Sequence, residues 1–252
     1  KTEDAGESRE LELRVARALK DLGAAIGKQR VAQTPLGEIT RADANALRDY
    51  LLERMKPSSV HRYITVVRAA VNYVITEHSL NIPNVFIGLR IKGASASVED
   101  RLPLNDHDLA MVAPNFEDDP VAQALFVTLT DTGARLSEIT GLEVRDVDLQ
   151  QRSITIRPNG IRQLKTKGSQ RTLPLSQRAL ELLQGHRRGK GDSDPIFAEY
   201  SRPRGRDAAS AMMMKRLRRS ITDKKLTMHS LRHRMKDKLR NTGCPEAISL
   251  AI

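Results

Sequence analysis

Hydrophobic residues recur at helical spacing, among many charged residues, through the first part of the chain. Residues 7–30 carry leucine, valine and alanine side chains on one face of a predicted helix, and we expect this helix to end near Gly23 or Gly27. Thr40 and Asp43 have the spacing of a capping box, which predicts the start of a second helix. This pattern is typical of a small helical bundle.

A third helix is predicted with Ser58 and Ser59 at its N-terminus, since serine is a favoured capping residue. The segment 93–100 is small, polar and without periodicity, as expected of an interdomain linker. The chain is therefore predicted to form a helical domain over residues 1–92 and a second domain over residues 101–252.

Helical patterns also dominate the second domain. Asn105 is placed to cap a helix that begins at Asp106, and residues 121–129 are apolar enough to form a buried helix. Ser176 predicts the start of a further helix, and residues 208–219 predict another. This domain is expected to be mostly helical.

After Gly141 the apolar positions recur with a period of two instead. Residues 153–157 alternate as a strand, and residues 161–165 and 171–175 predict two further short strands. The predicted fold is mainly α, with a helical first domain and a mostly helical second domain that carries a small three-stranded antiparallel sheet (α+β).

Positive charge is concentrated in the second half of the chain. Forty-two Lys and Arg residues against 31 Asp and Glu residues give a formal net charge of +11, which favours a polyanionic partner. Only 3% of the residues are aromatic and none is Trp. Because base stacking needs aromatic platforms, we expect contacts to phosphates and a fit to the groove instead.

Other features of the composition indicate where in the cell the protein acts and which cofactors it needs. Cys244 is the one cysteine of the sequence, which excludes an internal disulfide and agrees with a cytoplasmic location. No apolar run approaches the roughly twenty residues that cross a bilayer, and the acidic N-terminus does not resemble a signal peptide. No cluster of ligand residues indicates a metal, so neither a metal nor another cofactor is expected.

Arg135 and Glu138 lie at a predicted turn-to-helix junction, in the sequence Thr-Gly-Ala-Arg-Leu-Ser-Glu-Ile. Residues three apart share a helix face. Taken alone, this pair reads as a surface ion pair on a helix that packs through its apolar residues.

A second motif changes that interpretation. His229 and Arg232, again three residues apart, stand in the sequence His-Ser-Leu-Arg-His. Together with a lysine-bearing hairpin between them, the two motifs resemble those of the tyrosine recombinase (phage integrase) family, which are similar to Thr-Gly-Ala-Arg-x-Ser-Glu-Ile and His-x-Leu-Arg-His. Each motif alone is weak evidence, whereas the ordered pair with the hairpin is strong.

The resemblance implies DNA strand breakage and rejoining, and it suggests a role for each motif residue. Arg135 and Arg232 would clamp the non-bridging oxygens of the cleaved phosphate, because guanidinium groups stay charged and bind two oxygens at once. His229 would donate to the same phosphate or help to move a proton. Glu138 would hold Arg135, and His233, expected on another part of the helix surface, would be a supporting residue.

In this family a lysine on the turn between the second and third strands protonates the leaving 5′ oxygen. Lys165 and Lys167 both lie in the expected turn. Lys165 is preferred because Lys165-Thr166 is the better match to the family pattern, and Lys167 stays open as the alternative.

The family's nucleophile is a tyrosine that follows the second motif and forms a 3′-phosphotyrosine. Here the sequence departs from the pattern, because all four of its tyrosines precede that motif: Tyr50, Tyr63, Tyr73 and Tyr200. The nucleophile is thus unknown, and a tyrosine after Ile252 is expected.

The resemblance also implies partners: double-stranded DNA, three further copies in a homotetramer assembled on that DNA, and accessory DNA-bending proteins. Two alternatives remain. A truncated or decayed integrase would act only as a DNA-binding module, which covalent capture on DNA would distinguish. An enzyme similar to type IB topoisomerases would relax plasmids that lack any special site.

Overall fold

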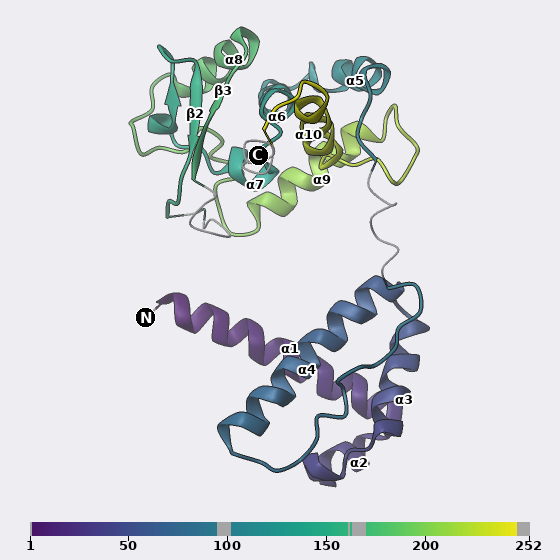
Figure 1. Ribbon diagram of the computed structural model, residues 1–252. Helices are drawn as coiled ribbons and strands as arrows, with labels where there is room; N and C mark the ends of the chain where they lie inside the picture. The colour runs from purple at the N-terminus through teal and green to yellow at the C-terminus, as the bar shows by residue number, and fades with distance from the viewer. Residues whose placement is uncertain (1, 95–101, 161, 163–169, 246–252) are drawn as a thin grey trace. The chain divides into compact units, whose positions relative to one another are not determined.

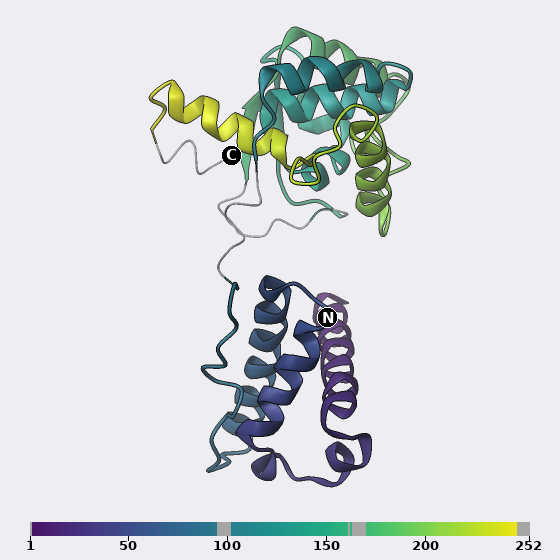
Figure 2. The ribbon, with the colours of Figure 1, turned by 90° about the vertical axis from the view of Figure 1, so that its right-hand side faces the viewer.

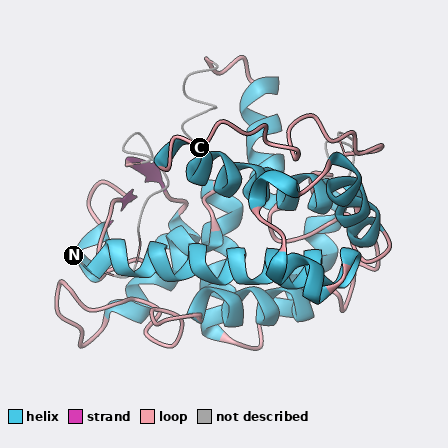
Figure 3. Cartoon of the chain, turned by 90° about the horizontal axis from the view of Figure 1, so that it is seen from below, coloured by secondary structure: helices cyan, strands magenta, loops and turns pink. Residues whose placement is uncertain are grey.

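The chain divides into two compact units, Lys1–Glu99 and Asp100–Ile252. Helices make up most of both units, and the described strands are few and short (Figure 3). The predicted class, mainly α with a small antiparallel sheet, is confirmed. The computed structural model describes residues 2–94, 102–160, 162 and 170–245, with side chains from residue 12 onward.

The first unit is a bundle in which α1, α3 and α4 lie side by side (Figures 1 and 2). Leu47, Leu51, Val60 and Ile64 fill its core, together with Phe86 from the segment after α4. The elements of this unit are α1 (Thr2–Ile26), α2 (Lys28–Gln33), the 3-10 turn Leu36–Glu38, α3 (Arg41–Leu52) and α4 (Pro57–Glu77).

Local sequence signals explain two of these helix ends. Gly27 has φ +101°, a conformation that suits glycine, and α1 ends just before it, as predicted. Thr40 and Asp43 form the expected capping box, in which the Asp43 carboxylate accepts from the Thr40 N–H at 2.9 Å.

The predicted cap of the third helix is wrong. Lys56 is the N-cap of α4 and makes no side-chain capping bond, and Pro57 is the first helical residue. Proline suits this position because its φ is preset and the helix needs no N–H there. Ser58 and Ser59 therefore lie inside the first turn.

The second unit is organised around α6, which contacts α7, α8, α9, α10 and the sheet. Leu125, Phe126 and Leu129 of α6 are buried, and the Phe126 ring stacks on Phe116 with centroids 4.3 Å apart. The helices of this unit are α5 (Asp106–Val112), α6 (Pro120–Thr132), α7 (Leu136–Thr140), α8 (Gln177–Arg187), α9 (Gly205–Leu217) and α10 (Ser230–Asn241), with 3-10 turns at Ala113–Phe116 and Val144–Asp146.

The described strands form one antiparallel sheet in the order β1-β2-β3, from β1 (Val147–Asp148), β2 (Ser153–Ile156) and β3 (Arg171–Pro174). The three-stranded sheet was predicted, but its first member was not, because two residues are too few to show alternation. Of the predicted strand 161–165 only Arg162 is described, and it lies in no strand.

Candidate active site

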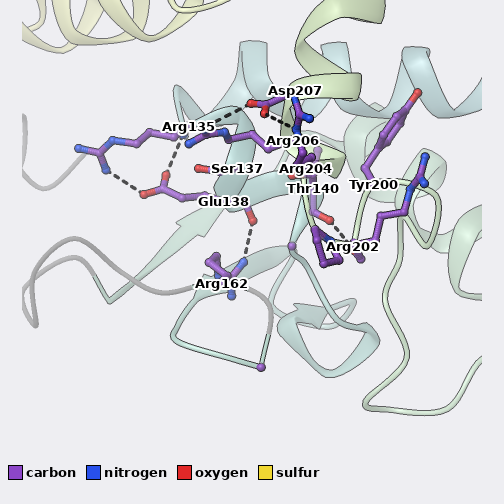
Figure 4. A pocket seen from close by; sticks show the side chains of 14 residues that line it. Arg135, Ser137, Glu138, Thr140, Arg162, Tyr200, Arg202, Arg204, Arg206 and Asp207 are labelled. Atoms are coloured by element: carbon purple, nitrogen blue, oxygen red, sulfur yellow. Dashed lines mark hydrogen bonds and ion pairs between the residues drawn. The ribbon is translucent and has the colours of Figure 1, made fainter. Parts of the chain in front are cut away.

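Arg135 is positioned by the way α6 ends. Gly133 adopts φ +61° and donates its N–H to the Leu129 carbonyl at 2.9 Å, so the chain leaves α6 in a left-handed turn. Arg135 is then the N-cap of α7. The Glu138 carboxylate accepts from the Arg135 backbone N–H at 2.7 Å and from its Nη1 at 2.9 Å (Figure 4). Glu138 thus fixes both the backbone and the side chain of Arg135.

A second arginine, which the sequence analysis missed as a site residue, binds the same carboxylate. Arg171, the first residue of β3, donates from Nη2 to Glu138 Oε2 at 2.7 Å and from Nη1 to Oε1 at 3.2 Å. The side chains of Arg171 and Glu138 are 8% and 4% exposed. Burial acts to raise the pKa of Glu138, but the bonds from Arg171 and Arg135 outweigh it and lower this pKa below its ordinary value. Glu138 therefore stays charged although it is buried.

Arg232 reaches the same junction from a distant part of the sequence. It is buried in the first turn of α10, and its Nη1 donates to the Gly133 carbonyl at 2.9 Å, across 99 residues of sequence. Burial and the positive charge of Arg135 lower the pKa of Arg232 to about 10, so it remains charged at neutral pH. The structure therefore brings the arginines of both motifs to the turn between α6 and α7.

The two histidines lie next to each other. His229 is exposed at the N-cap position of α10, and its ring meets that of His233 edge-on, with centroids 4.9 Å apart. The expectation that His233 points elsewhere is wrong, because residues four apart lie nearly above one another on a helix. The roles assigned to both histidines stay predictions.

Lys165 and Lys167 lie outside the described residues, but Arg162, three residues before Lys165, is held by hydrogen bonds to the chain around α7 and β2. Arg162 is buried, and its Nη1 donates to the Glu138 carbonyl at 2.6 Å while its Nη2 donates to the Arg157 carbonyl at 2.6 Å. Sequence reasoning also missed Arg162. Its only sequence signal is an arginine two residues after the turn Pro158-Asn159-Gly160, which is too common to single out.

Of the four tyrosines in the sequence, Tyr200 is the one that belongs to the unit carrying this site. Tyr50, Tyr63 and Tyr73 belong to the first unit. Burial and the neighbouring negative charge of Glu199 raise the pKa of Tyr200 to about 12, which disfavours the phenolate. Among the described residues no group of three His, Cys, Asp or Glu could hold a metal ion, and no described helix is long and apolar enough to cross a membrane.

Comparison with protein families matches residues 102–248 to the model of the phage integrase family. A curated relative, the tyrosine recombinase XerC of Pelobacter propionicus, is 24% identical over 200 residues, which are 74% of this chain and 62% of XerC. The matched part of the chain thus spans less than two thirds of that relative.

Two solved structures resemble the fold. The Tn1549 transposon integrase in complex with transposon right end DNA gives a TM-score of 0.70 at 20% identity, covering 94% of this chain and 83% of that one. A lambda integrase tetramer bound to a Holliday junction gives a TM-score of 0.63 at 16% identity, covering 91% and 73%.

Proposed function

The chain belongs to the phage integrase family, and from this premise we propose that it is the DNA-cleaving part of a site-specific recombinase that breaks and rejoins strands through a 3′-phosphotyrosine. The main support is the arrangement at Glu138. One buried carboxylate binds Arg135 and Arg171, and the buried Arg232 lies at the same turn. Three guanidinium groups for one carboxylate leave an excess of positive charge, which suits a phosphate.

In the proposed reaction a tyrosine oxygen attacks the phosphorus, the P–O5′ bond breaks, and the 5′ oxygen leaves as a hydroxyl group. Arg135 and Arg232 stabilise the charge that develops on the two non-bridging oxygens, and each such donor contributes a factor of about a hundred to a thousand. Lys165, or alternatively Lys167, protonates the 5′ oxygen, and His229 assists at the phosphate. We propose that the attacking tyrosine follows Ile252. The phosphotyrosine conserves the energy of the broken bond, so rejoining needs no ATP, and the arginines take the charge-stabilising role that a metal would otherwise have.

The assembly is also a proposal. The basic second half of the chain and the DNA named with the Tn1549 integrase support double-stranded DNA as the partner. The tetramer reported for lambda integrase on a Holliday junction supports a homotetramer on DNA, with accessory bending proteins as further partners. In this scheme residues 1–92 are the core-binding domain and residues 93–100 the linker.

Covalent capture on a nicked duplex tests the proposed function. A form of the protein that includes the proposed tyrosine after Ile252 should form a covalent adduct with the cleaved strand, and Arg135→Ala in that form should abolish the adduct while sparing most of the DNA binding. Arg178→Ala is a suitable control, because Arg178 is exposed and pairs at 3.5 Å with an exposed Glu117. Undiminished cleavage by Arg135→Ala would refute the assignment, and binding without any adduct would indicate a DNA-binding module.

A further inference from the structure

A cavity of about 660 Å³ lies beside Arg135, between α7 and the loop that precedes α9 (Figure 4). Its lining includes Arg135 and Ser137 from the α7 side and Arg202, Arg204, Arg206 and Asp207 from the loop and the start of α9. Arg202, Arg204 and Arg206 lie within five residues of the sequence and have no role in the cleavage chemistry described above. The proposed cleavage chemistry therefore does not explain the positive charge on the loop side of the cavity, and we ask which ligand would.

Backbone packing holds the loop in place. The Gly205 Cα lies so close to Tyr200 that a Cβ built on it would be 2.0 Å from the Tyr200 carbonyl oxygen. Arg204 adopts φ +59°, which is uncommon for a residue with a side chain. Ser201 Oγ donates to the Thr140 carbonyl at 2.8 Å and so ties the loop to α7. The arginines are thus presented on a framework that is fixed relative to Arg135.

The loop carries more positive than negative charge. Arg204 and Arg206, with side chains 91% and 68% exposed, share one acid, Asp207, at 3.9 and 3.3 Å. The Arg202 Nε donates to the backbone carbonyl of Glu199 at 2.9 Å, which leaves the charge of Arg202 without compensation from that bond. The N-terminus of α9, a helix of 13 residues, adds a partial positive charge at the same place. A small anion or a phosphodiester matches this field.

The position of the cavity narrows the identity of the anion. Arg135 lines the cavity and, under the proposed function, also binds the phosphate that is cleaved. One DNA strand carries a phosphate about every 3.4 Å along the helix axis, so neighbouring phosphates must lie close to that arginine. We propose that the cavity is a second phosphate site, which binds a backbone phosphate of the DNA flanking the cleaved one. This inference rests on the proposed function.

Salt-dependent DNA binding tests the site without cleavage. The double variant Arg204→Ala/Arg206→Ala should bind a duplex more weakly and reduce the salt dependence by about 0.9 log units of Kd per log unit of salt, the value for one lost phosphate contact. Asp207→Asn should have the opposite effect and bind more tightly, which a purely structural role of the loop would not produce. Arg178→Ala should leave the salt dependence unchanged.

A scan with single methylphosphonates, which are uncharged, identifies the phosphate. At one position near the cleavage site the neutral linkage should weaken wild-type binding and should have no further effect in Arg204→Ala/Arg206→Ala. An unchanged salt dependence in that variant would overturn the site. So would a scan in which every loss of binding follows the base sequence of the duplex and not the position of the neutral linkage. Failure of the cleavage mechanism would appear instead in the Arg135→Ala adduct assay.

Discussion

The Glu138→Gln substitution should destabilise the second unit strongly. The carboxylate accepts four bonds: from the Arg135 N–H and Nη1 at 2.7 and 2.9 Å and from Arg171 Nη2 and Nη1 at 2.7 and 3.2 Å. Glutamine keeps the shape but removes the charge, and its amide group directs N–H bonds at a guanidinium that can only donate. The variant also leaves the buried Arg171 and Arg232 without their shared counter-charge.

The size of the effect follows from the burial. Removing one partner of a buried ion pair costs about 3–5 kcal/mol, because the other charge remains desolvated. We expect about 3 kcal/mol, the low end of that range, since the amide oxygen still accepts some of the bonds. At about 2–4 °C per kcal/mol, the transition of the second unit should fall by roughly 6–12 °C. Differential scanning calorimetry of the whole protein measures this shift.

Glu117→Gln provides the matched control. Glu117 and Arg178 form an ion pair of the same chemistry, but their side chains are 54% and 60% exposed. Exposed pairs contribute about 0–1 kcal/mol because water screens them. If Glu138→Gln shifted the transition no more than Glu117→Gln does, the carboxylate would not be the charge centre of the site, and the reasoning would be refuted.

The pH dependence gives an independent check. The folded protein lowers the pKa of Glu138 below its ordinary value of 4.5. A carboxyl whose folded pKa is depressed contributes stability that is present above the unfolded pKa and is lost as the pH falls through the folded pKa. The stability difference between wild type and Glu138→Gln should therefore be constant above about pH 5 and shrink below pH 4.5. A difference that persisted unchanged at lower pH would contradict the assignment.

Three further predictions concern the loop before α9, the cap of α3 and the second arginine that binds Glu138. Gly205→Ala should lower the melting temperature of the second unit, because the added Cβ would meet backbone atoms of Tyr200. Gly185→Ala is the control: nothing lies within 4 Å of its Cβ position in α8, and alanine there should raise the free energy of unfolding by up to about 1 kcal/mol. Thr40→Ala should remove about 1 kcal/mol from the first unit by loss of the capping box, measured by urea unfolding. Arg171→Ala should slow adduct formation at least tenfold while the salt dependence of DNA binding stays the same, since Arg171 acts through Glu138.

Much of the fold follows from local signals in the sequence. The capping residues Thr40, Asn105 and Ser176 all cap helices in the structure, because a side chain that accepts from an N–H two or three residues ahead depends only on neighbours. The turn at Gly133 also depends on neighbouring residues, because its N–H bonds to the Leu129 carbonyl four residues earlier. The prediction that Ser58 and Ser59 cap α4 is wrong because Pro57 takes the first helical position and so sets the start of the helix.

Arg171 and Arg162 could not be found in this way. Arg171 reaches Glu138 across 33 residues and Arg162 reaches the Glu138 carbonyl across 24. Both contacts depend on how Arg162 and the first residue of β3 pack against α7, which no pattern of neighbouring residues encodes. A charged residue next to a turn also looks like a surface residue in the sequence, so burial of these arginines is visible only in the structure.

Under the proposed function, the excess of positive charge at the turn between α6 and α7 accounts for how the site would bind a DNA phosphate. The pKa of Arg232 falls to about 10 because burial and the positive charge of Arg135 act against its protonated form, and Glu138 offsets them only in part. The folded protein thus holds these cations close together before any substrate binds. A phosphate between Arg135 and Arg232 would supply the missing negative charge, and the charge that develops on its oxygens during cleavage would be stabilised further. Preorganised cations of this kind favour the transition state over the resting duplex, because no side chain has to be reoriented when the charge appears.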